Sequence, residues 1–160
     1  MQTIMVQMTD YRQTLATLHF ACAMALNVKA RITLVKMLPA QYAGWLGTEW
    51  GSWSFTDQDH AEMKDYQATA EDYGVEVSGE IFQYLTLMEA ISDAADYVDA
   101  QFVFATLPGS VIPFWRKFQV WALRKRLAQH GRQLFLSDQD HTRQTQVPSL
   151  LVSSVSKRSA

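Results

Sequence analysis

The sequence has little cysteine, no long apolar run and almost no excess charge. Its single cysteine, Cys22, cannot form a disulfide within the chain. No stretch approaches the roughly 18 consecutive apolar residues of a membrane-spanning helix, and Asp10 interrupts the first apolar run early. A formal net charge of -2 gives no general attraction to nucleic acid or to anionic membranes. These features predict a cytoplasmic protein that binds no nucleic acid and is not expected at a membrane.

The apolar residues that are present suffice for one hydrophobic core. The chain has 160 residues, of which 48% are hydrophobic, and this size is typical of a single domain. We expect that domain to span residues 1–138. Residues 139–160 are expected to form a loosely attached tail, with a β-prone segment at 148–155 that can cross onto a second copy as a swapped strand.

Strand-like and helix-like patterns alternate along the whole of the expected domain. Apolar or alternating runs predict strands at 3–8, 31–38, 75–83, 101–105 and 133–136. Apolar residues at helical spacing predict a helix between each strand and the next. Such alternation needs right-handed crossovers, which give a parallel sheet with helices on both faces. The sequence therefore predicts an α/β fold, a doubly wound five-stranded parallel sheet with the first strand at its centre.

Several residues are placed where helices begin or end. Asp10, Asp57 and Thr86 each precede a helical pattern and are predicted N-caps, Thr86 as the start of a capping box. Asn27 and Gly74 follow helical patterns and are predicted to end those helices in the left-handed conformation.

Three segments of the sequence, together with the order of the expected strands and helices, resemble the universal stress proteins. They are IMVQMTDYRQTL at 4–15, DYGVEVSGEIF at 72–82 and AISDAADYVDAQFVFATLPGS at 90–110, and the resemblance covers about residues 3–137. It implies a fold of the adenine nucleotide alpha hydrolase type. It also implies a homodimer formed by the last strand, here 133–136.

The nucleotide loop of that family, G-x-x-G, nine residues and G followed by Ser or Thr, is only partly present. Counted from the expected strand 101–105, the first glycine position falls on Thr106 and the second on Gly109. The third glycine and the hydroxyl position fall on Gln119 and Val120, or on Val120 and Trp121 when counted back from the last strand. Bulky residues replace the flexible turn that lets backbone amides approach phosphates. We therefore expect that the ATP site is lost or remodelled and that the protein has no cofactor.

A retained nucleotide site is the alternative. The acidic residue that ends the first strand in the family corresponds to Thr9, with Asp10 one step later. If a pocket remains at the strand ends, it would bind ATP, AMP or another small anion through Thr9, Asp10, Met37, Thr106, Gly109 and Ser110.

The expected helix from Pro113 has two apolar faces. Phe114, Phe118 and Trp121 lie on one face, and Val120, Leu123 and Leu127 lie on the other. A sheet can cover only one of them. The second cover could be the tryptophan-rich loop Trp45–Trp53, a partner subunit or a membrane surface bound through the segment FWRKFQVWALRKR. If Trp121 is buried, its replacement by alanine should cost about 3 to 5 kcal/mol.

The sequence shows no pattern typical of catalysis or metal binding. The histidines, His19, His60, His130 and His141, have no ligand spacing, and no serine elbow or Walker loop is present. We expect a non-enzymatic domain without a metal that acts through protein contacts, as a homodimer with a regulatory protein partner. The alternatives are the nucleotide-binding module and peripheral membrane attachment.

Overall fold

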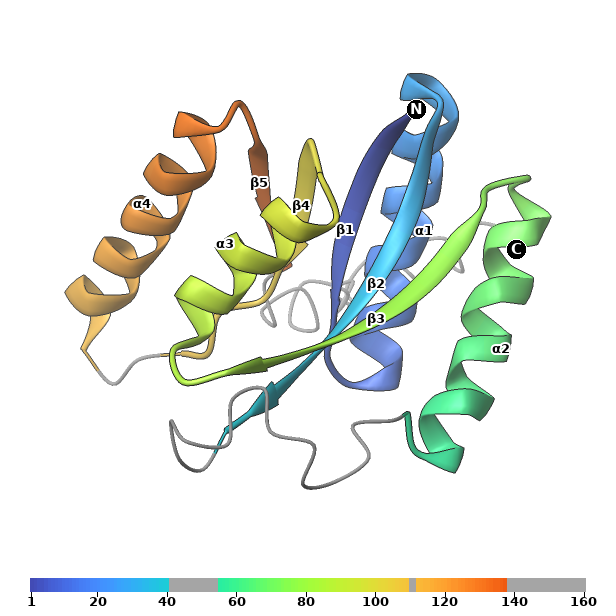
Figure 1. Cartoon of the computed structure of the whole chain (residues 1–160), viewed down its shortest axis with the longest axis horizontal. Coiled ribbons are helices and arrows are strands. Elements are labelled where there is room, and N and C mark those ends of the chain that lie inside the picture. Colours follow the sequence, from blue (N-terminus) through green and yellow to red (C-terminus); the bar gives the residue numbers. More distant parts are fainter. Residues whose placement is uncertain (41–54, 110–111, 138–160) are drawn as a thin grey trace, which may run out of the picture.

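The computed structural model describes residues 1–40, 55–109 and 112–137. These residues form a five-stranded, fully parallel sheet in the order β3-β2-β1-β4-β5 (Figure 1). The strands are β1 (Gln2–Met8), β2 (Ala30–Pro39), β3 (Val77–Tyr84), β4 (Phe102–Ala105) and β5 (Gln133–Leu136). The helices are α1 (Tyr11–Val28), α2 (Asp57–Asp72), α3 (Leu87–Tyr97) and α4 (Pro113–Gln129). The predicted fold class is confirmed, with β1 in the centre.

The sheet has a core on each face because successive side chains of its strands point in opposite directions. Ile4 and Val6 of β1 pack with α1 and α2 on one face, whereas Met5 packs with α3 and α4 on the other. β1 is buried from Thr3 onward, which explains why it reads as a continuous apolar run. α3 and α4 therefore lie together on one face of the sheet, with α3 against β2 and β3 and α4 against β5 (Figure 1).

The first two helices have different ends from those predicted. Asp10 is the N-cap of α1, as expected, and its carboxylate accepts the amide of Gln13 at 3.0 Å. The end of α1 was predicted wrongly, since the helix continues to Val28 and the left-handed residue is Lys29, with φ 55. The side chain of Asn27 instead donates to the carbonyl of Ala23 within the last turn, at 3.0 Å, which keeps Asn27 helical.

The N-cap of α2 is Thr56 rather than Asp57. Thr56 and Asp59 form a reciprocal capping box, which Asp57 could not form from its position inside the helix. Gly74 follows α2 with φ 70, as predicted. Thr86 is the N-cap of α3, but its hydroxyl donates to the Glu89 carboxylate at 2.5 Å and makes no capping hydrogen bond.

Three predicted features lie outside the described residues: the loop Trp45–Trp53, Ser110 and the tail 139–160. Within the described ranges, none of the helices is both long and apolar enough to cross a bilayer.

Candidate functional site

The carboxyl ends of β1 and β4 bring most of the predicted nucleotide residues to one edge of the sheet. Thr9 and Asp10 follow β1, and Thr106 and Gly109 follow β4, its direct neighbour. Met37 lies on β2, on the other side of β1, and packs against the core beneath α3 and α4. Parallel strands place their carboxyl ends together, and ligands of open α/β sheets bind at such ends.

Polar groups at this edge make hydrogen bonds within the chain. The amide of Thr9 donates to Thr14 Oγ1 at 2.9 Å, and the Thr9 hydroxyl donates to Gln13 Oε1 at 3.1 Å. The amide of Thr106 donates to the side-chain oxygen of Gln7 at 2.9 Å. A ligand at this edge would have to compete with these bonds, each of which is lost at a cost.

The chain that leaves β5 also reaches this edge. The hydroxyl of Ser137 lies 3.0 Å from that of Thr17, and its carbonyl accepts the side-chain amide of Gln13 at 3.3 Å. Ser137 therefore contacts the first two turns of α1, next to Thr9 and Asp10.

The backbone conformation at position 109 does not require a glycine. Unlike Gly74 and Gly131, it has no positive φ, and an added Cβ would meet no atom within 4 Å. The positions counted for the third glycine of the nucleotide loop, Gln119, Val120 and Trp121, lie inside the 17-residue helix α4.

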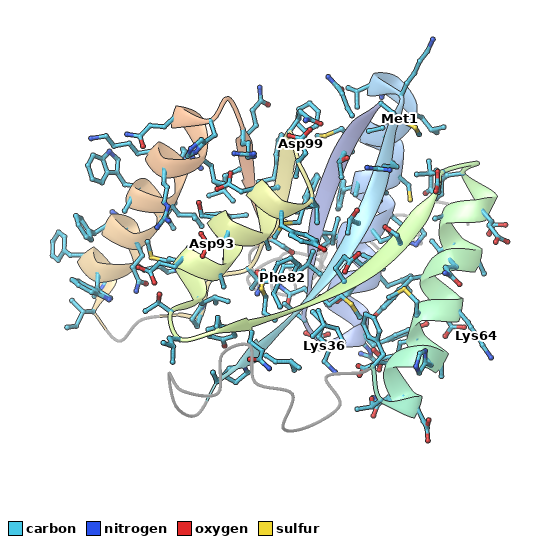
Figure 2. The ribbon with its side chains drawn as sticks, in the orientation of Figure 1. Met1, Lys36, Lys64, Phe82, Asp93 and Asp99 are labelled. Carbon is cyan, nitrogen blue, oxygen red and sulfur yellow. The ribbon has the colours of Figure 1, made fainter. Side chains whose placement is uncertain are left out.

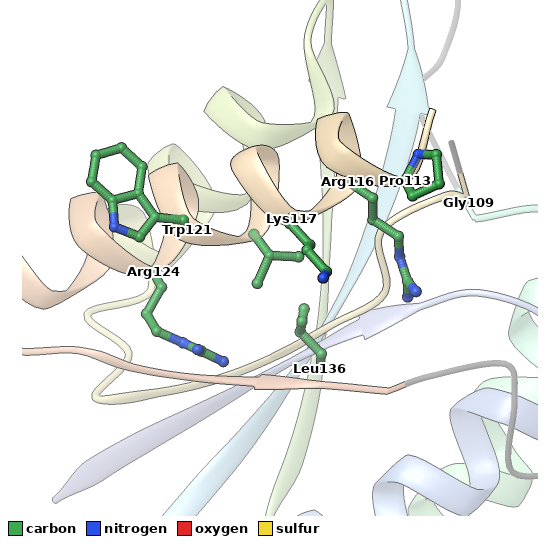
Figure 3. A pocket seen from close by; sticks show the side chains of 8 residues that line it. Gly109, Pro113, Arg116, Lys117, Trp121, Arg124 and Leu136 are labelled. Carbon is green, nitrogen blue, oxygen red and sulfur yellow. The ribbon is translucent and has the colours of Figure 1, made fainter. Parts of the chain in front are cut away.

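A groove that the sequence did not predict lies between α4 and β5. Its volume is about 540 Å³, and Figure 3 shows basic side chains of α4 on the side of the helix nearest Leu136 of β5. The groove is lined by Gly109, Pro113, Arg116, Lys117, Val120, Trp121, Arg124 and Leu136. The helical spacing of positions 117, 121 and 124 already places these residues on one side of a helix. The sequence did not show that β5 lies beside that side.

The two-faced description of α4 is confirmed, but burial of Trp121, the condition for a large loss of stability in Trp121→Ala, is not met. Leu123 and Leu127 are fully buried, whereas Trp121 is 57% exposed. The other large apolar side chains exposed along this helix are Phe114 at 82%, Trp115 at 54% and Phe118 at 54%. Phe118 lies 5.8 Å from Trp115 and 5.9 Å from Trp121, measured between ring centroids. We call these four residues the aromatic face of α4.

A partly buried ion pair joins β2 to the start of α2. Lys36, labelled in Figure 2, bonds to the carboxylate of Asp59. The same carboxylate also accepts the amide and hydroxyl of Thr56, both at 2.7 Å. Burial alone would raise the pKa of Asp59, but the hydrogen bonds from Lys36 and Thr56 outweigh it and hold that pKa below its usual value. This cluster stabilises the first turn of α2.

Cys22 is a free cysteine buried on α1. Burial raises the pKa of its thiol to about 11, so little thiolate forms near neutral pH. Among the residues that the structure describes, no three His, Cys, Asp or Glu side chains are grouped so that they could hold a metal ion.

Comparison with solved structures shows the fold. A universal stress protein in complex with cAMP aligns with a TM-score of 0.59 and 14% identity, covering 86% of this chain and 97% of that chain. A protein of the universal stress protein family from Burkholderia pseudomallei has a TM-score of 0.53 and 16% identity over 84% and 94% of the two chains. A universal stress protein from Archaeoglobus fulgidus has a TM-score of 0.53 and 17% identity, covering 86% of this chain and 94% of that chain. No family model matches the sequence, and no curated protein matches it significantly.

Proposed function

We propose, on the premise that the chain has the fold of the universal stress proteins, that it is a non-catalytic domain acting through protein contacts as a homodimer. The observation that carries this proposal is the surface beside β5. Among the described residues, the outer edge of this strand pairs with no other strand and adjoins the aromatic face of α4. A regulatory protein that reads the assembled dimer is part of the same proposal.

The backbone of β5 is arranged to accept another strand. Gln133 and Ser137 donate their amides to Gln101 and Ala105, along the β4 side. Because amides alternate in direction along a strand, those of Leu134 and Leu136 point to the other edge. In the part of the chain that the structure describes, no strand pairs with that edge. Unpaired strand edges readily bind a second chain.

The aromatic face extends the same surface. Trp121 and Leu136 line one groove, so the face and the strand edge are continuous. Contiguous exposed apolar side chains mark interaction surfaces, and tryptophan is enriched where interfaces are strongest. A second copy paired along β5 would cover Trp121 and would bury about 1,200 Å² or more in total if the contact is specific.

Light scattering tests the dimer. The intact protein is expected at twice 18.2 kDa. Leu136→Pro removes an outward amide without removing a bond to β4, and this variant should be monomeric. Leu136→Ala removes the side chain but keeps the amide, so it is the matched control and should remain dimeric. A monomeric intact protein, or a Leu136→Pro dimer as stable as the control, refutes pairing through β5.

Nucleotide binding is the second candidate, supported by the similar protein that was solved with cAMP and by the presence of Gly109 after β4. The internal hydrogen bonds of Thr9 and Thr106 support its absence instead. We expect no gain in affinity from an adenosine group. Calorimetric titration should compare ATP with inorganic tripolyphosphate and AMP with inorganic phosphate, because each pair matches in phosphate content. An adenosine group that tightens binding about ten-fold, or 1.4 kcal/mol, would show a retained nucleotide site and overturn this part of the proposal.

A further inference from the structure

We propose that the apolar segment 148–155 of the C-terminal tail docks on a surface that α1 forms with β4 and β5. We call this surface the α1 flank, and it consists of Phe20, Met24, Phe102 and Phe135. All four residues belong to one copy of the chain, so the inference does not rest on the proposed dimer. A tail that crosses onto a second copy meets the same surface there.

The helical part of the flank is an exposed apolar stretch of α1. Four residues follow one another at spacings of four, three and four, which places them on one side of the helix: Gln13, Thr17, Phe20 and Met24. Phe20 is 73% exposed, and Met24 is only partly buried against the core. This side of α1 therefore presents two large apolar side chains beyond the polar pair Gln13 and Thr17.

Two phenylalanines continue the flank onto the sheet. Phe102 of β4 and Phe135 of β5 belong to the core on the α1 face and are only partly buried. Their ring centroids lie 6.4 Å apart. α1 and α2 pack mainly on β1, β2 and β3 (Figure 1), so β4 and β5 keep apolar surface on this face. Neighbouring exposed apolar side chains of this kind mark an interaction surface.

The described chain ends beside this surface. Ser137 follows Phe135 by two residues, and its hydroxyl lies 3.0 Å from that of Thr17. Its carbonyl accepts the side-chain amide of Gln13 at 3.3 Å. Both partners lie on the side of α1 that carries Phe20, which is three residues, or about 4.5 Å along the helix axis, beyond Thr17. The tail therefore begins within about one helical turn of the exposed ring.

The length and composition of the tail identify it as the occupant of the flank. Residues 138–147 connect Ser137 to the apolar segment, and ten residues span up to about 33 Å. From Thr17 to the end of α1 the helix rises only about 16 Å, so the segment reaches the whole flank. Its large apolar residues are Leu150, Leu151, Val152 and Val155. Docking removes these side chains and the phenyl rings from water together, and the tether raises their effective concentration.

Thiol labelling measures whether the segment is docked. Val152→Cys places a thiol of similar size in the segment. The test variant adds Phe20→Asp, which puts a charge on the flank. The matched control adds Leu26→Asp, because Leu26 is also exposed on α1, at 53%, but lies on the side where His19 meets Tyr73 of α2. Thermal melting confirms that both aspartate variants are folded.

We expect iodoacetamide to label the thiol of Val152→Cys about ten-fold more slowly in the parent and the control than in the test variant. Docking shields the thiol, and Phe20→Asp opposes docking because the new carboxylate would be buried without a partner. Intact mass follows the reaction, to which the fully buried Cys22 should not contribute. Equal labelling in all three proteins, or equal acceleration by both aspartates, overturns the inference.

Cross-linking shows where the segment docks. Phe20→Cys combined with Val152→Cys should form a disulfide on mild oxidation, whereas Leu26→Cys combined with Val152→Cys should not. A product of monomer mass means that the tail docks on its own copy, and one of twice that mass means that it docks on a second copy. Equal cross-linking of both pairs, or of neither, refutes docking on the flank.

A last variant distinguishes the tail from any other cover. If the thiol of Phe20→Cys stays shielded when Val152→Asp disrupts the segment, a different part of a second copy covers the flank and the inference fails. Loss of the shielding supports the tail. Light scattering measures the proposed dimer separately, so a failure of one proposal is not a failure of the other.

Discussion

Asp59 is the residue whose charge contributes most clearly to local structure. It closes the capping box of α2 and holds the ammonium of Lys36, although it is 8% exposed. Asp59→Ala should lower the free energy of unfolding by about 2 kcal/mol, because a capping bond and a charged partner are lost together. Asp57→Ala, on the exposed side of the same turn, is the control and should cost less than about 1 kcal/mol. Urea unfolding at pH 7 measures both.

The contribution of Asp59 should depend on pH in one direction. Although burial opposes it, hydrogen bonding to Lys36 and Thr56 lowers the pKa of Asp59 in the folded protein, and an unfolded aspartate titrates near 3.9. A lowered folded pKa means that the carboxylate stabilises the fold above that pH and loses this effect as the pH falls through the folded value. The difference between the intact protein and Asp59→Ala should therefore be constant from about pH 6 to 8, where the carboxylate is ionised in both states, and shrink below about pH 4. A difference that persists at low pH would show that packing, not charge, is responsible.

Cys22 should be inert in the folded protein. Its thiol is fully buried and its pKa is about 11, so both access and thiolate formation are limited at pH 8. Iodoacetamide should label it only after denaturation, as measured by intact mass. Rapid labelling of the native protein would mean that α1 opens readily or that the thiol is accessible.

At the scale of elements, replacement by alanine should have opposite effects on stability at two glycines whose backbone conformations differ. Gly74 ends α2 with φ 70, where a Cβ is strained, so Gly74→Ala should destabilise the protein by about 1 kcal/mol. Gly109 has no positive φ and open space around it. Gly109→Ala should leave stability unchanged or raise it by a few tenths of a kcal/mol. Thermal melts of the two variants compare them directly; an unstable Gly109→Ala would mean that the loop after β4 needs glycine.

The two faces of α4 should respond differently to truncation. Leu123 is fully buried in the core that α4 shares with α3 and β5, and Leu123→Ala should cost about 2 to 5 kcal/mol. Trp121 is 57% exposed, and Trp121→Ala should cost less than about 1 kcal/mol in a monomer. Unfolding at low protein concentration measures these values. A large loss for Trp121→Ala that grows with concentration would instead report its burial by a second copy.

At the scale of the whole molecule, the tail and β5 make separable contributions to association. The tail is expected to cross onto the partner, so a chain ending at residue 138 should dimerise more weakly than the intact protein. Light scattering over a range of concentrations measures the shift. An unchanged dimer would refute only the role of the tail, whereas a monomer in both chains would refute the dimer itself.

The sequence by itself determined the order of the elements, the parallel sheet and the inward side of α3. These features are periodic and local: Ile91 and Ala95 had to be buried whichever sheet they met, and both are. Helix ends were less predictable, because the choice between Asn27 and Lys29, or between Asp57 and Thr56, depends on single hydrogen bonds.

Only the tertiary structure decided what surrounds α4 and the strand ends. The rotation of α4 about its own axis is set by Leu123 and Leu127, which pack against residues far away in the sequence. That rotation exposes Trp121 and turns Lys117 and Arg124 toward β5, forming a groove that neither segment contains alone. Likewise, the bond from Thr106 to Gln7 spans 99 positions. Local patterns encode burial, but a site is made by the relative placement of distant elements, which the packing of the whole core fixes.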